Sequence, residues 1–290
     1  MSTLRSSATL SLALRFSVVI LPIVLATAPH ALADCPDWPE PGALTANPTR
    51  PSESLPGDPV QPGVVQLESG WTQSWLSDNA GQTSFPTMLR FGVWCNMEVR
   101  WNSSPVLRDT TPSTSVSGFG DNFIGGQYRF LHESKHKPSL SLGYTVKFPS
   151  ANAGLGLGSG RNDHIATMMI SKTLYGFSFT GNVNYFEIGQ PAGRFNAKSE
   201  WVFCVAHTLR GRLGAMGEVY HDTHLNLAND AYTSSTWALT YNLTRRVVLD
   251  SGTYLSLSSG AGNPGRSAFV GVTYAVGTVF TRPGPAPAAN

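Results

Sequence analysis

Apolar and polar residues alternate along most of this chain with a period of two. Between residues 64 and 280 the alternation divides into twelve segments, separated by stretches rich in turn-forming residues. The segments are 64–76, 85–94, 96–103, 118–131, 138–148, 163–174, 176–188, 197–210, 212–221, 231–243, 246–257 and 267–280. None shows the 3.6-residue period of an amphipathic helix, so each is predicted to be a β-strand.

The last segment, residues 267–280, shows the pattern most clearly. One face is apolar and the other is mostly small, with Phe269, Gly271, Thr273, Ala275 and Gly277. Segment 138–148 likewise has leucine, tyrosine, valine and phenylalanine on one face and mostly small polar residues on the other. About 9–11 tilted residues cross the hydrocarbon of a bilayer, so strands of this kind suit a membrane barrel with its apolar faces outward. The small, uncharged inner face of the last strand predicts a smooth side of the lumen.

The connections between segments alternate in length. They are short after every even-numbered segment and longer after every odd-numbered one, as in 104–117 and 149–162. Outer-membrane barrels have short periplasmic turns and longer external loops. The sequence therefore predicts an all-β fold, a transmembrane antiparallel up-and-down β-barrel of about 12 strands over residues 64–280, with both termini in the periplasm.

Composition agrees with a membrane barrel. Only 13% of the residues are charged, whereas a soluble surface uses roughly a quarter. No run of about 18 apolar residues occurs beyond the N-terminus, so helical spans are not predicted. The net charge is +2 and the basic residues do not cluster, which argues against nucleic acid as a partner.

Three further segments flank the barrel. Residues 1–33 are predicted to be a signal peptide, because Arg5 and Arg15 precede or enter an apolar stretch that ends at a small-residue cleavage site. Residues 34–63 are rich in proline and are predicted to be an extended periplasmic segment, with its entry into the lumen left open. Residues 281–290 are predicted to be a flexible tail. Export through a cleaved signal peptide then leads to the bacterial outer membrane. The expected partners are its lipid, the barrel-assembly machinery and a small solute, and the oligomeric state stays undetermined.

The predicted inward faces carry acids and bases together. These are the candidate lumen and solute-contacting residues: Glu68, Arg90, Glu98, Arg100, Asp121, Arg129, Lys147, Glu200, Arg210, Glu218 and Asp250. Charges enclosed in a barrel must pair. Two interpretations stay open. The pairs form a constriction that orients a polar or aromatic solute, or they form a network that plugs the lumen.

A glycine-rich stretch and a histidine pair are the other candidate sites. Residues 154–163 carry alternate glycines but precede a strand, so they predict a mobile external loop over the mouth, with Arg161 and Asp163 near solute, and not a phosphate site. His221, Asp222 and His224 could bind a metal ion or form an Asp–His hydrolytic pair. Isolated residues of this kind are common in barrels, so neither a cofactor, a metal nor an enzymatic activity is predicted.

The three cysteines give one hypothesis. Cys35 and the turn residue Cys95 both lie on the periplasmic side in this topology, and an oxidising compartment permits a disulfide between them. Such a bond would hold the proline-rich segment under the barrel.

Short motifs in a fixed order carry a resemblance to a known family. They lie at residues 50–52, 62–70, 89–93, 97–100, 120–121, 126–130, 138–143, 147–149 and 156–160. Together they resemble the outer-membrane transporter-like proteins of the MetA-pathway of phenol degradation, over about residues 48–280. The resemblance implies an outer-membrane barrel associated with the breakdown of aromatic compounds.

The resulting prediction is a channel for passive uptake of small, aromatic or hydrophobic molecules. Twelve strands enclose a narrow lumen, between those of a filled eight-stranded barrel and an open sixteen-stranded porin. A structural or adhesive barrel with a plugged lumen is the alternative, and an outer-membrane hydrolase is a third.

Overall fold

The computed structural model describes residues 44–76, 79–190, 193–224, 230–258 and 265–280. The predicted signal peptide, the first part of the proline-rich segment and the tail after residue 280 lie outside these residues. No helix in the described ranges is long and apolar enough to cross a bilayer.

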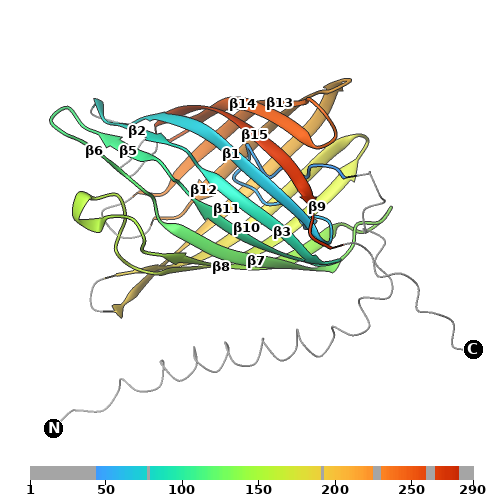
Figure 1. Ribbon diagram of the computed structural model, residues 1–290, viewed down its shortest axis with the longest axis horizontal. Coiled ribbons are helices and arrows are strands. Elements are labelled where there is room, and N and C mark those ends of the chain that lie inside the picture. Colours follow the sequence, from blue (N-terminus) through green and yellow to red (C-terminus); the bar gives the residue numbers. More distant parts are fainter. Residues whose placement is uncertain (1–43, 77–78, 191–192, 225–229, 259–264, 281–290) are drawn as a thin grey trace, which may run out of the picture.

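The described strands form one antiparallel sheet that closes on itself (Figure 1). They are β1 (Val64–Trp75), β2 (Gly81–Ser84), β3 (Thr87–Trp94), β4 (Met97–Ser103), β5 (Leu107–Thr110), β6 (Ser115–Gly118), β7 (Asn122–Leu131), β8 (Ser139–Phe148), β9 (Asp163–Leu174), β10 (Phe177–Gly189), β11 (Phe195–Arg210), β12 (Leu213–Asp222), β13 (Tyr232–Asn242), β14 (Val247–Ser256) and β15 (Arg266–Thr278). Pairing of β15 with β1 along their whole lengths closes the barrel. A closed sheet leaves no unpaired edge in the lipid.

The fifteen strand segments form a twelve-stranded barrel, because three of its twelve strands are interrupted and count as two segments each. β2 continues into β3 and both pair with β1, β4 continues into β5, and β6 continues into β7, where β6 pairs with β5 and β7 pairs with β4. Pro86 and Pro105 lie in two of the breaks, where a proline cannot donate to the ladder. The predicted barrel of about 12 strands is confirmed. Residues 104–117, expected to be a loop, instead contain the β5–β6 hairpin, which extends the wall.

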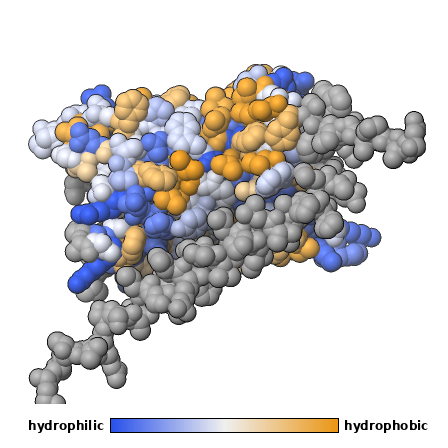
Figure 2. Space-filling view, turned by 60° about the horizontal axis from the view of Figure 1, so that its bottom comes forward, coloured by the Kyte–Doolittle hydropathy of each residue, from blue (hydrophilic) through white to orange (hydrophobic). Residues whose placement is uncertain are grey.

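The faces of the strands are inverted relative to those of a soluble barrel. Large apolar side chains such as Leu142, Trp201 and Trp237 are more than half exposed on the outside, while Glu68, Glu98 and other polar groups are fully buried inside. Figure 2 shows hydrophobic surface gathered along the wall and the more hydrophilic residues towards the ends. Lipid therefore replaces the apolar core as the environment of the hydrophobic faces.

Residues 46–63 lie inside the barrel, and we call them the inner ring. In Figure 1 this blue segment occupies the right-hand part of the barrel, at the end that carries the short turns. The ring enters where the backbone N–H of Ala46 donates to the carbonyl of Arg245, in the turn between β13 and β14 (2.9 Å). It leaves where Gly63 donates to Gly92 of β3 (2.7 Å), directly before β1 begins.

Candidate functional site

The inner ring follows the barrel wall through almost a full circuit. Its side chains and backbone bond in turn to β1, β14, β12, β10, β9, β8, β7, β4 and β3. This order is that of the strands read backwards from the closure. The ring therefore narrows the lumen on all sides at the end of the short turns.

Buried carboxylates of the wall accept hydrogen bonds from the backbone of the ring. Glu68 accepts from the N–H groups of Thr49 (3.0 Å) and Arg50 (2.9 Å). Glu98 accepts from the N–H of Val60 (2.7 Å). Hydrogen bonds to ionised acceptors are roughly twice as strong as neutral ones, so these two acids hold both ends of the ring.

A third acid and an amide hold the middle of the ring. Glu218 of β12 accepts from the N–H groups of Glu53 (2.9 Å) and Ser54 (3.0 Å). The Asn182 side chain of β10 accepts from the N–H of Leu55 (2.6 Å) and donates to its carbonyl (2.9 Å). The amide thus pairs with the ring backbone as a neighbouring strand would.

The returning half of the ring bonds to β7, β8 and β9. Gly57 donates its N–H to the hydroxyl of Ser171 (2.8 Å). Asp58 pairs with Arg129 (2.7 Å) and accepts from the hydroxyl of Ser139 (2.8 Å). The predicted lumen residue Arg129 therefore contacts the ring.

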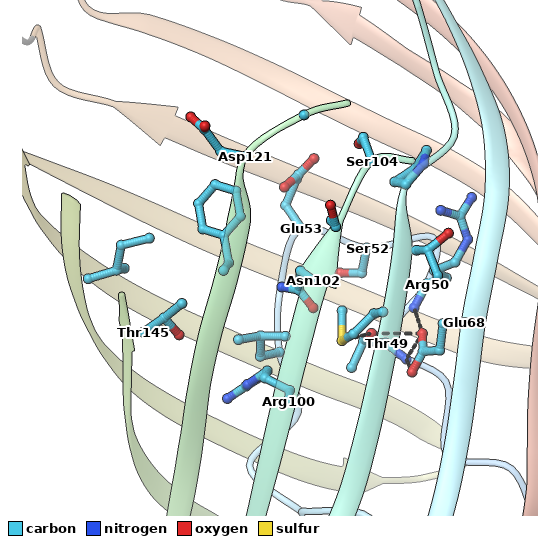
Figure 3. Close-up of a pocket in the computed structure, with 18 of the residues that line it drawn as sticks. Thr49, Arg50, Ser52, Glu53, Glu68, Arg100, Asn102, Ser104, Asp121 and Thr145 are labelled. Atoms are coloured by element: carbon cyan, nitrogen blue, oxygen red, sulfur yellow. Dashed lines mark hydrogen bonds between the residues drawn. The ribbon is translucent and has the colours of Figure 1, made fainter. Parts of the chain in front are cut away.

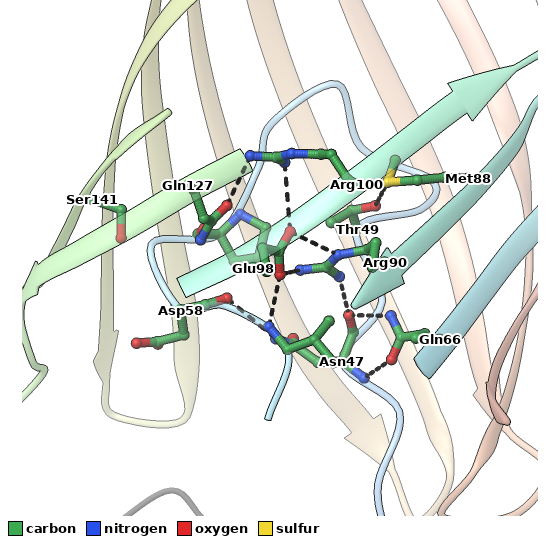
Figure 4. A network of polar contacts seen from close by, with 12 residues as sticks. Asn47, Thr49, Asp58, Gln66, Met88, Arg90, Glu98, Arg100, Gln127 and Ser141 are labelled. Carbon is green, nitrogen blue, oxygen red and sulfur yellow. Dashed lines mark hydrogen bonds and ion pairs between the residues drawn. The ribbon is translucent and has the colours of Figure 1, made fainter. Parts of the chain in front are cut away.

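Four predicted lumen charges meet in one buried network, and Figure 4 shows three of them, Arg90, Glu98 and Arg100. Arg90 pairs with Glu68 (3.1 Å) and with Glu98 (2.7 Å), and all three side chains are 0% exposed. Arg100 lies 3.8 Å from Glu98, and Arg90 also donates to the backbone carbonyl of Asn47 in the ring (2.6 Å). Two bases and two acids compensate one another, which the burial of charge requires.

Arg50 of the ring occupies the side of the lumen that was expected to be smooth. Its guanidinium pairs with Asp250 of β14 (3.3 Å). A Cβ built on Gly70 or on Gly271 would lie 2.5 Å from an Arg50 nitrogen. The small inner face of the last strand is real, but its space is filled by the ring, so the expectation of a smooth, unobstructed side is wrong.

A second ionic cluster lies at the end of the long connections. Lys147 pairs with Asp163 and lies 3.6 Å from Asp121. Asp121 also accepts from the N–H of Ala151, in the long connection between β8 and β9 (2.9 Å).

The glycine-rich part of that connection packs on the wall. Leu157 is buried, and a Cβ on Gly118 of β6 would lie 2.8 Å from its side chain. Arg161 is exposed, whereas Asp163 faces Lys147. The loop is anchored by these contacts, and its expected contact with solute stays a prediction.

Two predicted lumen residues remain to be placed. Glu200 of β11 accepts from the side-chain amide of Asn184 on β10 (2.7 Å). The prediction that Arg210 faces the lumen is wrong, because this residue is exposed at the end of β11 beside a short turn. The pairing of β11 is irregular between Thr208 and Arg210, which interrupts the alternation of faces. Arg210 therefore does not share the enclosed inner surface with the other candidates.

A cavity of about 560 Å³ lies beside the inner ring and is bounded by β1–β5 and β7–β10 (Figure 3). Its charged lining residues are Arg50, Glu53, Glu68, Arg100 and Asp121. Its apolar lining includes Leu55, Met88, Phe123, Ile165 and Phe186. The ring contributes residues 49–55 to this lining, so the cavity and the ring form one site.

Glu53 is the one acid of the ring that lines this cavity. Its side chain lies inside the barrel, near the carboxyl groups of Glu200, Glu218 and Asp222. This enclosure, together with the neighbouring carboxylates, raises the pKa of Glu53 from its ordinary 4.5 to about 8. The raised pKa favours the neutral form of the Glu53 carboxyl group.

The residues around His221 do not form a joint site. His221 is exposed on the outer face and contacts the hydroxyl of Thr233 (3.0 Å), whereas Asp222 faces inward and pairs with Lys198. Neighbouring residues of a strand point to opposite faces. Among the described residues no cluster of three potential metal ligands occurs.

Sequence reasoning missed the neutral polar residues that hold the ring. Asn182, Ser171 and Ser139 lie on inward faces of predicted strands, so their orientation was readable from the alternation. Their partners were not, because the proline-rich segment has no periodicity that places it against a wall.

A family model matches residues 50–279, which cover most of the ring and the whole barrel; its description is "Putative MetA-pathway of phenol degradation". The chain belongs to this family. Among solved structures, the chain is similar to an outer membrane channel from Pseudomonas putida F1, with 9% identity, a TM-score of 0.58, and coverage of 79% of this chain and 98% of that one. The NanC porin has 12% identity and a TM-score of 0.49, with coverage of 72% and 98%. At these identities the likeness concerns the fold. No curated protein matches the sequence.

Proposed function

We propose that this MetA-pathway protein is a passive channel of the bacterial outer membrane for small aromatic or apolar molecules, exported through a cleaved signal peptide. The observation that carries the proposal is the 560 Å³ cavity inside a closed barrel whose outer face is apolar. A barrel with an apolar outer face needs lipid around it, and an internal cavity lined by both polar and apolar side chains offers a place for a solute.

The lining of the cavity supports a small amphipathic solute. Phe123, Ile165 and Phe186 face inward, although the inner faces are otherwise mostly polar. Arg50 and Asn102 line the same space with polar groups. A molecule with an aromatic ring and a polar substituent finds partners for both parts there.

The inner ring is the constriction of this channel. It bonds to nine strands and stands between the cavity and the end of the short turns, which we assign to the periplasm. A solute that enters from outside reaches the cavity first and passes the ring second. The proposed rate-limiting step is therefore passage at the ring.

A structural barrel with a plugged lumen is the second candidate function, and the extent of the ring's bonding favours it. The two functions differ in one measurable property, which is permeability. A hydrolytic function has less support, because His221 and Asp222 face opposite sides of the wall. We therefore propose that the protein is not an enzyme.

Reconstitution decides between a channel and a plugged barrel. Folded protein is incorporated into planar bilayers and into liposomes loaded with an impermeant osmolyte. We expect discrete conductance steps and swelling in solutions of small neutral solutes, with swelling rates that fall steeply as solute size increases. Liposomes without protein are the control. Absence of both conductance and swelling would establish the plugged barrel.

A further inference from the structure

We propose that the cavity beside the inner ring binds small aromatic carboxylates, with the carboxylate near Arg50 and Arg100 and the aromatic ring against Phe123, Ile165 and Phe186. The inference rests on the proposed channel function and names its preferred class of solute. Four features of the cavity support it.

Arg100 has hydrogen-bond donors that no described residue uses. Its Nη2 donates to the side chain of Gln127 (3.0 Å), but its Nε and Nη1 are buried without an acceptor. The nearest acid, Glu98, lies 3.8 Å from Nη1 and makes its shorter contacts to Arg90 and to the N–H of Val60. Buried donors are normally satisfied. Rotation about the terminal torsions of Arg100 turns these donors to a carboxylate in the cavity that this residue lines.

Arg50 supplies a second cation from the other side. Its side chain is 14% exposed and lines the same cavity, while its contacts to Asp250 are long, at 3.3 and 3.4 Å. Gly70 and Gly271 leave the space in which its guanidinium lies. Arg50 is thus held at the wall and partly open to the lumen, as Figure 3 shows.

The acids that line the cavity are already engaged or neutral. Glu68 accepts hydrogen bonds from Thr49, Arg50, Gln66 and Arg90.

Asp121 accepts from Ala151 and lies beside Lys147. Its enclosure and the neighbouring carboxylates raise the pKa of Glu53 to about 8, which favours the neutral form and weakens its repulsion of an anion. A protonated carboxyl group in an enclosed site acts as a donor to an anionic oxygen. The cavity therefore favours an anion over a cation.

Contact with lipid does not explain the apolar side chains of Phe123, Ile165 and Phe186, because they face the lumen. Ile165 pairs with Phe186 across β9 and β10, and Thr145 pairs with Ile165 across β8 and β9, so these residues lie side by side on the inner wall. Phe123 lies on β7 opposite Asn102 of β4. Lipid cannot contact inward side chains, whereas an aromatic guest gains from stacking and burial against them.

Direct binding to the detergent-solubilised, folded protein tests the proposal with three probes of equal ring size. These are benzoate, benzyl alcohol and benzylammonium, and titration calorimetry at pH 7 gives their affinities. We expect benzoate to bind roughly tenfold or more tightly than benzyl alcohol, since a hydrogen bond to a charged group is stronger than one to a neutral group. Benzylammonium should bind least.

Arg100→Gln should weaken benzoate by roughly tenfold to a hundredfold and leave benzyl alcohol unchanged. Arg210→Gln is the matched control, because it removes the same charge at the exposed end of β11. Equal loss in both variants would assign the effect to the overall field and overturn the site. Equal affinity of wild type for benzoate and benzyl alcohol would overturn it as well, and this comparison holds even if Arg100→Gln fails to fold.

Conductance in the absence of any aromatic compound separates this inference from the channel function. A conducting protein without a preference for benzoate keeps the channel and rejects the site. A protein that binds benzoate in this order but does not conduct keeps the site and rejects the channel.

Discussion

At the scale of single residues, the inner wall depends on compensated charge, and Arg90 is the clearest case. Replacing it by Met leaves Glu68 and Glu98 buried at 0% exposure without the base that joins them. We expect a loss of about 3–5 kcal/mol in the free energy of unfolding, because breaking a buried pair leaves an uncompensated charge. Urea unfolding in detergent or lipid measures it.

Lys172→Met provides the control for that loss. Lys172 pairs with Glu133 at the end of the short turns, where both side chains are partly exposed. A surface pair contributes about 0–1 kcal/mol. Similar losses in the two variants would contradict the role assigned to burial.

Glu53 gives the ring a dependence on pH. Its pKa is about 8 in the barrel and about 4.5 when the ring is undocked, so the undocked state releases the proton more readily. The contribution of Glu53 to docking is full below pH 4.5 and is lost as the pH rises through about 8. The groups that face it are Glu200 of β11, Glu218 and Asp222 of β12, Arg50 of the ring, and the phenols of Tyr220 and Tyr254.

We therefore expect single-channel conductance to rise between pH 6 and pH 9 in wild type, and this rise to be absent in Glu53→Gln. Glu133→Gln, which removes an acid that pairs with Lys172 of β9, should keep the wild-type profile. A rise of the same size in Glu53→Gln would assign the effect to another group.

A substitution at Gly271 tests whether the space beside this glycine holds the Arg50 guanidinium in place. A Cβ at this position would lie 2.5 Å from the Nε of Arg50, so Gly271→Ala should displace the guanidinium and loosen the ring. We expect a protease added at the short-turn end of the barrel to cleave the ring faster, and we expect a larger conductance. Gly277→Ala is the matched control on the same face of the same strand, because nothing lies within 4 Å of its Cβ. Equal effects of the two changes would contradict the claim that the space at Gly271 holds Arg50 in place.

At the scale of elements, the turn between β3 and β4 carries a cross-link. Cys95 is disulfide-bonded and Cys204 is free. Cys35 lies outside the described residues, and as the third cysteine of the chain it is the partner that we predict for Cys95. Thiol labelling of denatured, unreduced protein should then modify one cysteine, and mass spectrometry should find a peptide pair joined through Cys35 and Cys95. Three labelled thiols would reject the bond.

The strands were predictable where local sequence decides the structure, and not where closure of the barrel decides it. Alternation places Val270 outward and Thr273 inward on β15, and the structure agrees. The breaks at Pro86 and Pro105 lie opposite each other and do not end the strands, because ladder pairing resumes beyond them between β2 and β5. The bond from Leu55 to Asn182 joins residues 127 positions apart, and no local pattern encodes it.

The same distinction explains the predicted site. The charges on inward faces were identified from the alternation of faces along each strand alone, and most of them do lie in the lumen. Their partners were predicted to be solute or one another. Arg90 does pair with Glu68 and Glu98, but these two acids and Glu218 also bind the backbone of the ring. A segment without periodicity gives no register, so only the folded barrel reveals it as a partner.

At the scale of the whole molecule, the barrel and its inner ring have separate roles, since the strands pair only with one another while the ring bonds to most of them. We predict that replacing residues 46–62 by a glycine–serine linker of equal length preserves the barrel but removes the constriction. The barrel should still migrate as a heat-modifiable band, although with a lower midpoint of unfolding, because three buried carboxylates lose their donors. Conductance should rise, and the size limit for solutes in liposome swelling should increase towards that of the bare twelve-stranded lumen. If the linker variant folds with wild-type conductance and the same size limit, the constriction lies elsewhere along the lumen, and the ring serves only to stabilise the wall.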